Sequence, residues 1–501
     1  MGDETLQGYL IVAAFRGDND PGGDIFHAFQ FVQGILQKVV KGSGHMGHLK
    51  VIHGAFHGFI GKTKKAEHAA SDGDIHAGFA TQHSAATVEF TTPAVSSEPL
   101  KGMIARTVEG DEAIRAAGAR LVANLDRLFT AAFPPLRYAQ SERHGAGVMA
   151  IDGSGRRWIS AGLDRTFAAI GDPTPIWIDD ATLLAAAEDR GQVHVYRLTV
   201  DGSMPKVLTD GALNVTGFGH RGGTFATTRS TVSRTGELFV ERDGATEQVT
   251  SIGMTGSGWE RFVVPCTDQS DEIDAWIMRP ADFDPDRTYP VLLNVHGGPF
   301  TQYGEVFFDE AQMQAAAGFV VLMSNPRGGS GRDTAWGQSI LGPKHPDAPG
   351  TGWGSVDVDD VLAVLDAALA TYEFCDPDRV GMLGGSYGGY MATLLAARHG
   401  DRFRAICSER AVNNLLTEEW SSDIGTFFRA EHGIDPVQDP DEYMRMSPVR
   451  LAADIHVPML IIHSEDDLRC PINQAEELWM TLRLLDRDVT FYRFPGENHE
   501  L

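Results

Sequence analysis

The sequence predicts an α/β protein in which a parallel-rich, doubly wound sheet is preceded by an all-β region. Three observations predict this fold class. Compact apolar runs alternate with helical stretches after about residue 256. Short strands separated by turn dipeptides fill about residues 145–255. The 501-residue chain also has 42% hydrophobic and 22% charged residues, an ordinary globular composition that excludes collagen-like, low-complexity and wholly disordered proteins.

The first part of the chain, residues 1–95, has an atypical composition. Residues 1–100 hold eight of the 18 histidines and a single arginine, Arg16, and they show no sustained helical or strand period. We expect residues 1–95 to be a poorly ordered extension. The spacing of its central histidines is too irregular for a metal site, so none is expected at His45, His48, His53, His57 and His68.

The second part, residues 96–255, is predicted to be a partial, propeller-like β region. The run HVYRL (194–198) matches ELFVE (237–241), and each is followed by an Asp-Gly pair, at 201–202 and again 42 residues later at 243–244. Asp-Gly between alternating runs indicates a hairpin, and a weaker copy stands at Asp152-Gly153. A period near 42 with about four strands per repeat is typical of β-propeller blades. Only two or three blades fit, and a plain antiparallel β domain is the alternative.

The third part, residues 256–501, is predicted to be the catalytic domain. Its strands are expected in VLLNVHGG, FVVLMSNPRGG, RVGMLGGS, FRAICSE and PMLIIHSEDD, with helices in VDDVLAVLDAALATYE and GYMATLLAARHG. Near-continuous apolar strands that alternate with helices favour a parallel sheet covered on both faces. Function in such a sheet collects in the loops at the carboxyl ends of the strands.

A candidate nucleophile, Ser386, stands between a predicted strand and a predicted helix. It is the central residue of GGSYG (384–388), and a serine at such a sharp turn projects its hydroxyl above the sheet. Small neighbours are needed because the turn brings backbones close together. The alternative for this segment is a glycine-rich turn that only packs or that holds a phosphate.

A serine needs a base that is oriented by a carboxylate. Asp466 and Asp467 follow an apolar strand, and His499 follows a later β-like run. The order Ser386, Asp467, His499 along the chain is the one used by α/β-hydrolases. We predict that Asp467 orients His499 and that His499 takes the proton of Ser386. The alternatives are a helix cap or solvated turn at the acidic pair and an ordinary surface histidine.

Acyl transfer also needs N–H donors for an oxyanion. His296-Gly297-Gly298-Pro299 follows the first strong strand, as in the HGGG-type element of esterases. We predict that the backbone N–H groups of Gly298 and Tyr387 form the oxyanion hole. A tight turn before Pro299 is the alternative.

Five motifs together resemble those of the prolyl oligopeptidase family of serine peptidases, and most nearly its acylaminoacyl-peptidase and dipeptidyl-aminopeptidase branch. The motifs are NVHGGP (294–299), NPRGGSG (325–331), GGSYGGYM (384–391), IIHSEDDLRCP (461–471) and FPGENHEL (494–501). The resemblance implies an α/β-hydrolase domain beside a β-propeller that restricts access to short peptides. The family's acid stands two places before an Arg or Asn, which favours Asp467 over Asp466.

The chain departs from that family in two ways. The family's propeller usually has seven blades, and its catalytic domain continues beyond the histidine into a closing helix. We therefore expect a truncated propeller-like region and a truncated carboxyl-terminal end.

Residues that would choose the substrate are harder to predict. Relatives that release dipeptides hold the substrate amine with acidic residues, for which Glu188-Asp189 is a candidate, although a hairpin turn explains this pair equally well. Trp420, Phe427 and Phe428 are candidates for a side-chain pocket, with ordinary core aromatics as the alternative.

Function and surroundings follow from these residues and from the charge. The motifs predict a serine peptidase of short peptides without metal or organic cofactor; a carboxylesterase with the same triad and a catalytically impaired fragment or scaffold are the alternatives. The net charge of −26 argues against nucleic acid or an anionic membrane as a partner. No apolar run suits a transmembrane helix or a signal peptide. Dispersed cysteines fit a reducing cytoplasm, and the oligomeric state stays open, a homo-oligomer included: Cys266, Cys375, Cys407 and Cys470.

Overall fold

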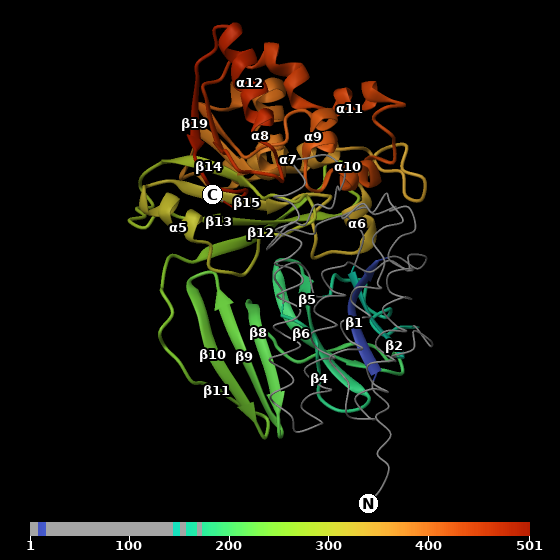
Figure 1. Ribbon diagram of the computed structural model, residues 1–501. Coiled ribbons are helices and arrows are strands. Elements are labelled where there is room, and N and C mark those ends of the chain that lie inside the picture. Colours follow the sequence, from blue (N-terminus) through green and yellow to red (C-terminus); the bar gives the residue numbers. More distant parts are fainter. Residues whose placement is uncertain (1–8, 17–143, 151–156, 168–172, 501) are drawn as a thin grey trace, which may run out of the picture. The chain divides into compact units, whose positions relative to one another are not determined.

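The computed structural model describes residues 9–16, 144–150, 157–167 and 173–500 (Figure 1). The predicted extension 1–95 therefore lies outside the described residues apart from strand β1 (Tyr9–Arg16), and so does the turn at Asp152-Gly153. β1 forms a three-stranded sheet with β2 (His144–Ala150) and β3 (Arg157–Trp158). All later strands belong to a compact unit that contains Gly162–Thr199 and Ser203–Leu501.

The β region contains two successive antiparallel units of four strands. The strands of the first unit are β4 (Ile176–Trp177), β5 (Thr182–Asp189), β6 (Gln192–Thr199) and β7 (Lys206–Val207). Those of the second are β8 (Asn214–Arg221), β9 (Thr224–Thr231), β10 (Arg234–Arg242) and β11 (Ala245–Gln248). A single parallel pair, Val193 with Asn214, joins the two units.

The hairpins follow the predicted repeat. β10 turns into β11 through Asp243-Gly244, both with positive φ (51° and 78°), as a two-residue type I′ turn requires. At the matching position β6 pairs antiparallel with β7, but the connection spans residues 200–205 and is longer than the dipeptide predicts. The all-β character of the region is thus confirmed.

The α/β domain is built on one eight-stranded sheet, with the order β12-β13-β15-β14-β16-β17-β18-β19. Its strands are β12 (Trp259–Pro265), β13 (Glu272–Met278), β14 (Tyr289–Val295), β15 (Val320–Asn325), β16 (Cys375–Gly385), β17 (Ala405–Glu409), β18 (Met459–Ser464) and β19 (Val489–Phe494). β14 to β19 run parallel to one another, whereas β12 and β13 are antiparallel to their neighbours. This is the predicted α/β-hydrolase sheet.

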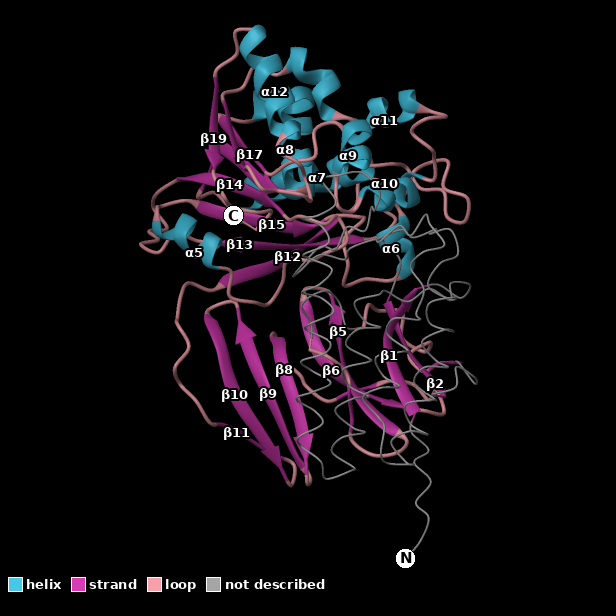
Figure 2. Ribbon diagram, viewed as in Figure 1, coloured by secondary structure: helices cyan, strands magenta, loops and turns pink. Residues whose placement is uncertain are grey.

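Helices follow the strands of this sheet, and within the described residues none precedes position 309 (Figure 2). They are α5 (Asp309–Ala316), α6 (Thr334–Gln338), α7 (Val356–Thr371), α8 (Tyr387–His399), α9 (Leu415–Ser421), α10 (Gly425–His432), α11 (Pro440–Met446) and α12 (Asn473–Leu484), with 3₁₀ turns at Gly400–Arg402 and Pro448–Asp454. Among these described helices, none is both long enough and apolar enough to cross a lipid bilayer.

Both faces of the sheet are covered, as β15 shows. All six residues of this strand are buried. Val320 and Leu322 join the large core with α7 and α8, whereas Val321 and Met323 pack against α5. Alternate side chains of a strand point to opposite faces, so α5 covers one face and α7 and α8 the other.

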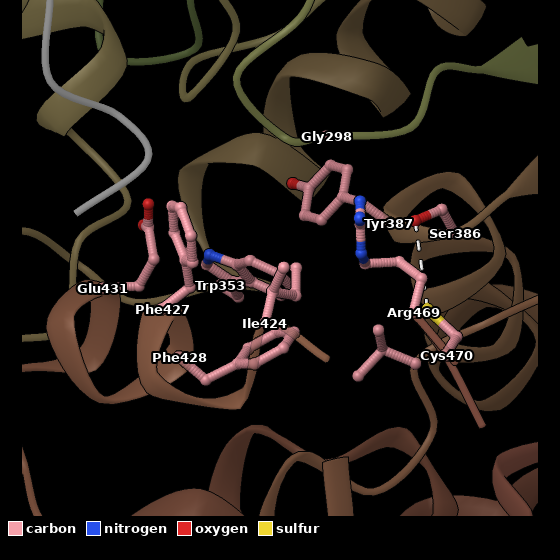
Figure 3. Close-up of a pocket in the computed structure, with 11 residues that line it drawn as sticks. Gly298, Trp353, Ser386, Tyr387, Ile424, Phe427, Phe428, Glu431, Arg469 and Cys470 are labelled. Atoms are coloured by element: carbon pink, nitrogen blue, oxygen red, sulfur yellow. Dashed lines mark hydrogen bonds between the residues drawn. The ribbon is translucent and has the colours of Figure 1, made fainter. Parts of the chain in front are cut away.

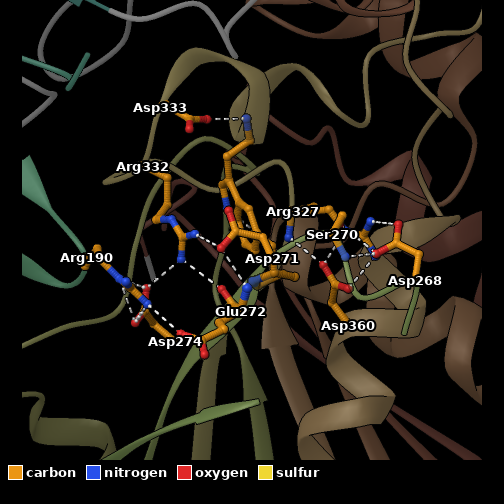
Figure 4. Close-up of polar contacts among 12 residues, drawn as sticks. Arg190, Asp268, Ser270, Asp271, Glu272, Asp274, Arg327, Arg332, Asp333 and Asp360 are labelled. Carbon is orange, nitrogen blue, oxygen red and sulfur yellow. Dashed lines mark hydrogen bonds and ion pairs between the residues drawn. The ribbon is translucent and has the colours of Figure 1, made fainter. Parts of the chain in front are cut away.

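A buried ion pair fixes the loop that follows β15. Arg327 donates through Nε and Nη2 to the Asp360 carboxylate at 2.8 and 2.7 Å, and the two side chains are 8% and 0% exposed (Figure 4). We expect Arg327→Met to lower the free energy of unfolding by about 3–5 kcal/mol, because Asp360 is left buried without its counter-ion. Urea denaturation measures the change.

The matched control is Arg279→Ala, which removes the exposed pair between Arg279 and Glu260 (2.9 Å, side chains 47% and 50% exposed). Exposed pairs contribute about 0–1 kcal/mol, so the midpoint should hardly move. An equal loss of unfolding free energy in the two variants would contradict the special role of the Arg327 pair.

Candidate active site

The nucleophile candidate lies at the strand-to-helix turn that the sequence predicts. Ser386 stands between the end of β16 and the start of α8, with φ 61° and ψ −118°. This conformation is strained for a residue with a Cβ, and such strain is typical of functional turns. The turn is also tight, because a Cβ at Gly388 would lie 2.1 Å from the carbonyl oxygen of Val295. The hydroxyl is thereby held at the carboxyl edge of the sheet, at the amino end of α8.

The acid candidate is held by the loop after β18. Asp467 is buried, and its Oδ1 accepts hydrogen bonds from the backbone N–H groups of Arg469 and Cys470, both at 2.9 Å. Oδ2 is thus left for another partner. Asp466, by contrast, is exposed, and its N–H donates to the Glu497 carbonyl oxygen. The two neighbouring aspartates therefore have different environments, and only Asp467 faces the interior.

That partner is the predicted base. Nδ1 of His499 lies 2.8 Å from Oδ2 of Asp467, which fixes the ring with Nδ1–H as the donor. Burial alone would raise the pKa of Asp467, but hydrogen bonds from His463 and His499 outweigh it and hold this pKa well below its usual range. The carboxylate is therefore ionised at neutral pH beside the imidazole.

Cys470 lies between the candidate nucleophile and the candidate acid. Ser386 Oγ lies 4.0 Å from Cys470 Sγ, and the N–H of the same cysteine binds Asp467. Between the described atoms of Ser386 and His499 there is no hydrogen bond. Catalytic hydrogen bonds are often loose without substrate and tighten in the complex. The structure thus brings Asp467 and His499 into contact and places Ser386 beside Cys470, whose N–H binds Asp467.

The predicted oxyanion donors lie beside Ser386. Gly298 has φ 115°, which a side chain would not tolerate, and it lines the same pocket as Ser386 and Tyr387 (Figure 3). Tyr387 is the first residue of α8, where backbone N–H groups have no partner within the helix. Its phenol donates to the buried Asp357 carboxylate at 2.5 Å, which fixes this end of the helix.

An apolar pocket opens next to Ser386. Its aromatic wall is continuous, since the rings of Trp353 and Tyr387 meet edge to face at 5.0 Å and those of Trp353 and Phe428 at 5.8 Å. Two of the three predicted aromatics line the pocket, whereas Trp420 is 59% exposed and is not among its lining residues. The full lining is Gly298, Trp353, Ser386, Tyr387, Val412, Ile424, Phe427, Phe428, Glu431, Arg469 and Cys470 (Figure 3).

The other candidates do not join this site. Glu188 and Asp189 end β5 at a hairpin, and Asp189 forms an ion pair with Arg165 at 2.7 Å. Over the residues described, no group of three or more His, Cys, Asp and Glu side chains is arranged to hold a metal ion. The histidines from His45 to His68 lie outside those residues.

Two curated proteins are similar to this chain in sequence. The chain is 32% identical to the uncharacterized peptidase YuxL of Bacillus subtilis over 343 residues (65% of this chain, 50% of that protein). It is 26% identical to dipeptidyl-peptidase 5 of Aspergillus fumigatus over 347 residues (64% of this chain, 45% of that protein). The chain thus spans about half the length of these curated relatives.

A solved structure has a similar fold. The acylaminoacyl peptidase of Pyrococcus horikoshii superposes with a TM-score of 0.63 at 27% identity, over 72% of this chain and 55% of the other. The model of the prolyl oligopeptidase family matches residues 305–501, which carry Ser386, Asp467 and His499. The part of this chain that is similar to the prolyl oligopeptidase family therefore lies within the α/β domain.

Proposed function

We propose that this chain is a serine peptidase that hydrolyses short peptides through an acyl-enzyme on Ser386. The single observation that carries the proposal is the 2.8 Å contact between Asp467 and His499. Ser386, on its strained strand-to-helix turn, supplies the hydroxyl. A carboxylate, an imidazole and a hydroxyl in this order are what acyl transfer needs.

The steps follow from these groups. Nε2 of His499 accepts the Ser386 proton as Oγ attacks the peptide carbonyl carbon, and the N–H groups of Gly298 and Tyr387 stabilise the oxyanion. His499 then gives its proton to the amine, which leaves as the C–N bond breaks. Water then attacks the carbonyl carbon of the ester while His499 takes a proton from the water. The bond between this carbon and Ser386 Oγ breaks, His499 returns the proton to Oγ, and the acid product departs.

The pocket supports a preference for large apolar side chains. Its lining includes Trp353, Ile424, Phe427 and Phe428, together with two charged residues, Glu431 and Arg469. Burial of an apolar side chain there is favourable by about 25 cal/mol per Å². We infer that the residue whose carbonyl is attacked carries an aromatic or long aliphatic side chain.

Two further properties, the nature of the β region and the cellular location, can be inferred. We infer that the two four-stranded β units are blades of a β-propeller, because each is antiparallel and each contains one of the Asp-Gly pairs that stand 42 residues apart. All four cysteines are free, and three of them are buried. Unpaired thiols are typical of a reducing compartment, so we propose a cytoplasmic location.

A substrate panel tests this function. We expect N-acetyl-Phe and N-acetyl-Leu p-nitroanilides to be hydrolysed at least about tenfold faster, as kcat/KM, than the Asp and Lys analogues, because charged side chains lose hydration in the pocket. Dipeptidyl anilides with a free amine distinguish removal of dipeptides from removal of acylated residues. Hydrolysis of p-nitrophenyl esters with no hydrolysis of any anilide would instead identify an esterase. A folded protein that cleaves neither would be a non-enzymatic relative.

A further inference from the structure

The tip of the β5–β6 hairpin contacts the loops of the α/β domain that surround the oxyanion donor. Arg190-Gly191 forms this tip, and both residues have positive φ (49° and 81°), as in a type I′ turn. The Arg190 N–H donates to the Gly331 carbonyl oxygen at 2.7 Å. The Gly191 N–H donates to Gln302 Oε1 at 2.8 Å, and the Gly191 carbonyl oxygen accepts from the Glu305 N–H at 2.6 Å.

The contact at the tip is too close for side chains. A Cβ on Gly304 would lie 1.8 Å from the Gly191 carbonyl oxygen, and a Cβ on Gly191 would lie 2.4 Å from the Trp276 ring. The two backbones therefore touch directly, and the position of one sets the position of the other.

This contact continues to the predicted oxyanion donor through one short segment. Gln302 follows Thr301, whose hydroxyl donates to the Gly297 carbonyl oxygen at 2.7 Å and whose N–H donates to that of Pro299 at 2.8 Å. The Gly297 carbonyl oxygen also accepts from His296 Nδ1–H at 2.7 Å. Residues 297–305 are thus held at one end by the end of β14 and at the other by the hairpin tip.

The side chain of Arg190 adds a charged anchor. Its Nε and Nη2 lie 3.0 and 2.9 Å from the carboxylate oxygens of Asp274, a side chain that is only 2% exposed (Figure 4). Arg261 and Arg332 bind the same carboxylate. Loss of Arg190 would therefore leave Asp274 with two other cations, so the effect of a variant would not arise from an unpaired buried charge.

We propose that Arg190 and Gln302 are positioning residues, which hold the segment 297–305 so that the Gly298 N–H faces the developing oxyanion. The inference rests on the proposed function, since it concerns the same site. It also gives the glycine-rich NPRGGSG segment (325–331) a role, because the Gly331 carbonyl oxygen accepts the hydrogen bond from the hairpin tip. The β region then contributes to catalysis without touching the substrate.

The test uses the whole chain and two variants. Arg190→Asn keeps the turn, because Asn-Gly is a preferred type I′ pair, and removes only the guanidinium group. Gln302→Ala removes the hydrogen bond to Gly191. For both we expect kcat on the N-acetyl-Phe anilide to fall about tenfold or more with little change in KM, because the displaced N–H group acts only on the transition state.

A pair of inhibitors separates positioning from a general structural defect. N-acetyl-phenylalaninal forms a tetrahedral adduct with a serine and should bind the variants more weakly by the factor lost in kcat/KM. N-acetyl-phenylalaninol forms no adduct and should bind as in the parent chain. The control variant Arg279→Ala, whose side chain pairs with Glu260, should match the parent chain.

The results distinguish the two proposals. Unchanged kcat and aldehyde affinity in both variants, with an active parent chain, would overturn the positioning inference alone. Equal weakening of the aldehyde and the alcohol would also overturn it, because the substrate pocket would then be at fault. A folded parent chain that neither cleaves the anilide nor reacts with a fluorophosphonate would overturn the proposed function and this inference with it.

Discussion

Replacing Ser386 with alanine should abolish covalent labelling by a fluorophosphonate and lower kcat by about 10⁵- to 10⁶-fold. The hydroxyl is the group that forms the acyl-enzyme in our proposal, and no neighbouring group replaces it. Cys470 Sγ lies 4.0 Å from it, but burial raises the pKa of this thiol well above its usual value and keeps it protonated. A protonated thiol is a poor nucleophile.

The measurement is hydrolysis of the N-acetyl-Phe anilide together with mass spectrometry of the labelled protein. Ser386 already has a Cβ at its strained φ of 61°, so alanine fits the same turn and the fold should persist. The control is Ser421→Ala at the end of α9, an exposed serine that binds only the Thr417 carbonyl oxygen of its own helix. Retained labelling in Ser386→Ala would assign the nucleophile elsewhere.

Replacing Asp467 with asparagine should lower kcat by about 10⁴-fold at neutral pH. Oδ1 of asparagine would still accept from the N–H groups of Arg469 and Cys470, so the loop keeps its shape. The amide NH₂ would then face His499 Nδ1 and favour the tautomer that carries its proton on Nε2. That nitrogen could no longer accept the proton of Ser386.

Asp466→Asn is the matched control, since this carboxylate is adjacent in sequence but exposed. We expect less than a twofold change for it. Equal losses in the two variants would show that the negative charge of the loop matters rather than the contact with His499.

The same pair makes a stability contribution with a definite pH dependence. The pKa of Asp467 is lower in the folded chain than its ordinary 3.8, so ionisation favours the folded state. This contribution is complete above about pH 4 and is lost as pH falls through the lower folded pKa. The stability difference between the parent chain and Asp467→Asn should therefore shrink on acidification below pH 4.

The sheet could be predicted from the sequence because its strands have an unambiguous pattern. The run VVLMSN (β15) is buried on both faces, and such a run between helices is typical of a central parallel strand. The Ser386 turn was also predictable, since local sterics demand its small neighbours. The pairing of Asp467 with His499 followed from chain order, although 32 residues separate them.

The pocket could be predicted only in part because distant segments form it. Phe427 and Phe428 were candidates from the sequence, but Trp353 and Ile424 belong to a loop before α7 and to the turn before α10, and no spacing links them. Trp420 has the same local character as Phe427 and yet is exposed. Tertiary packing decides which aromatic side chain faces the nucleophile. The contact of Cys470 with Ser386 was missed for the same reason, although Cys470 stands in the acid motif.

The position of β19 at the edge of its sheet has a consequence for how firmly His499 is held. In the described residues this strand pairs with β18 alone, through the six positions from Val489 to Phe494, and His499 follows it after a four-residue segment. The imidazole therefore follows an edge strand, whereas Ser386 follows the central strand β16. An edge strand is paired on one side only, so local opening of β19 would carry His499 away from Asp467 and leave the turn at Ser386 in place.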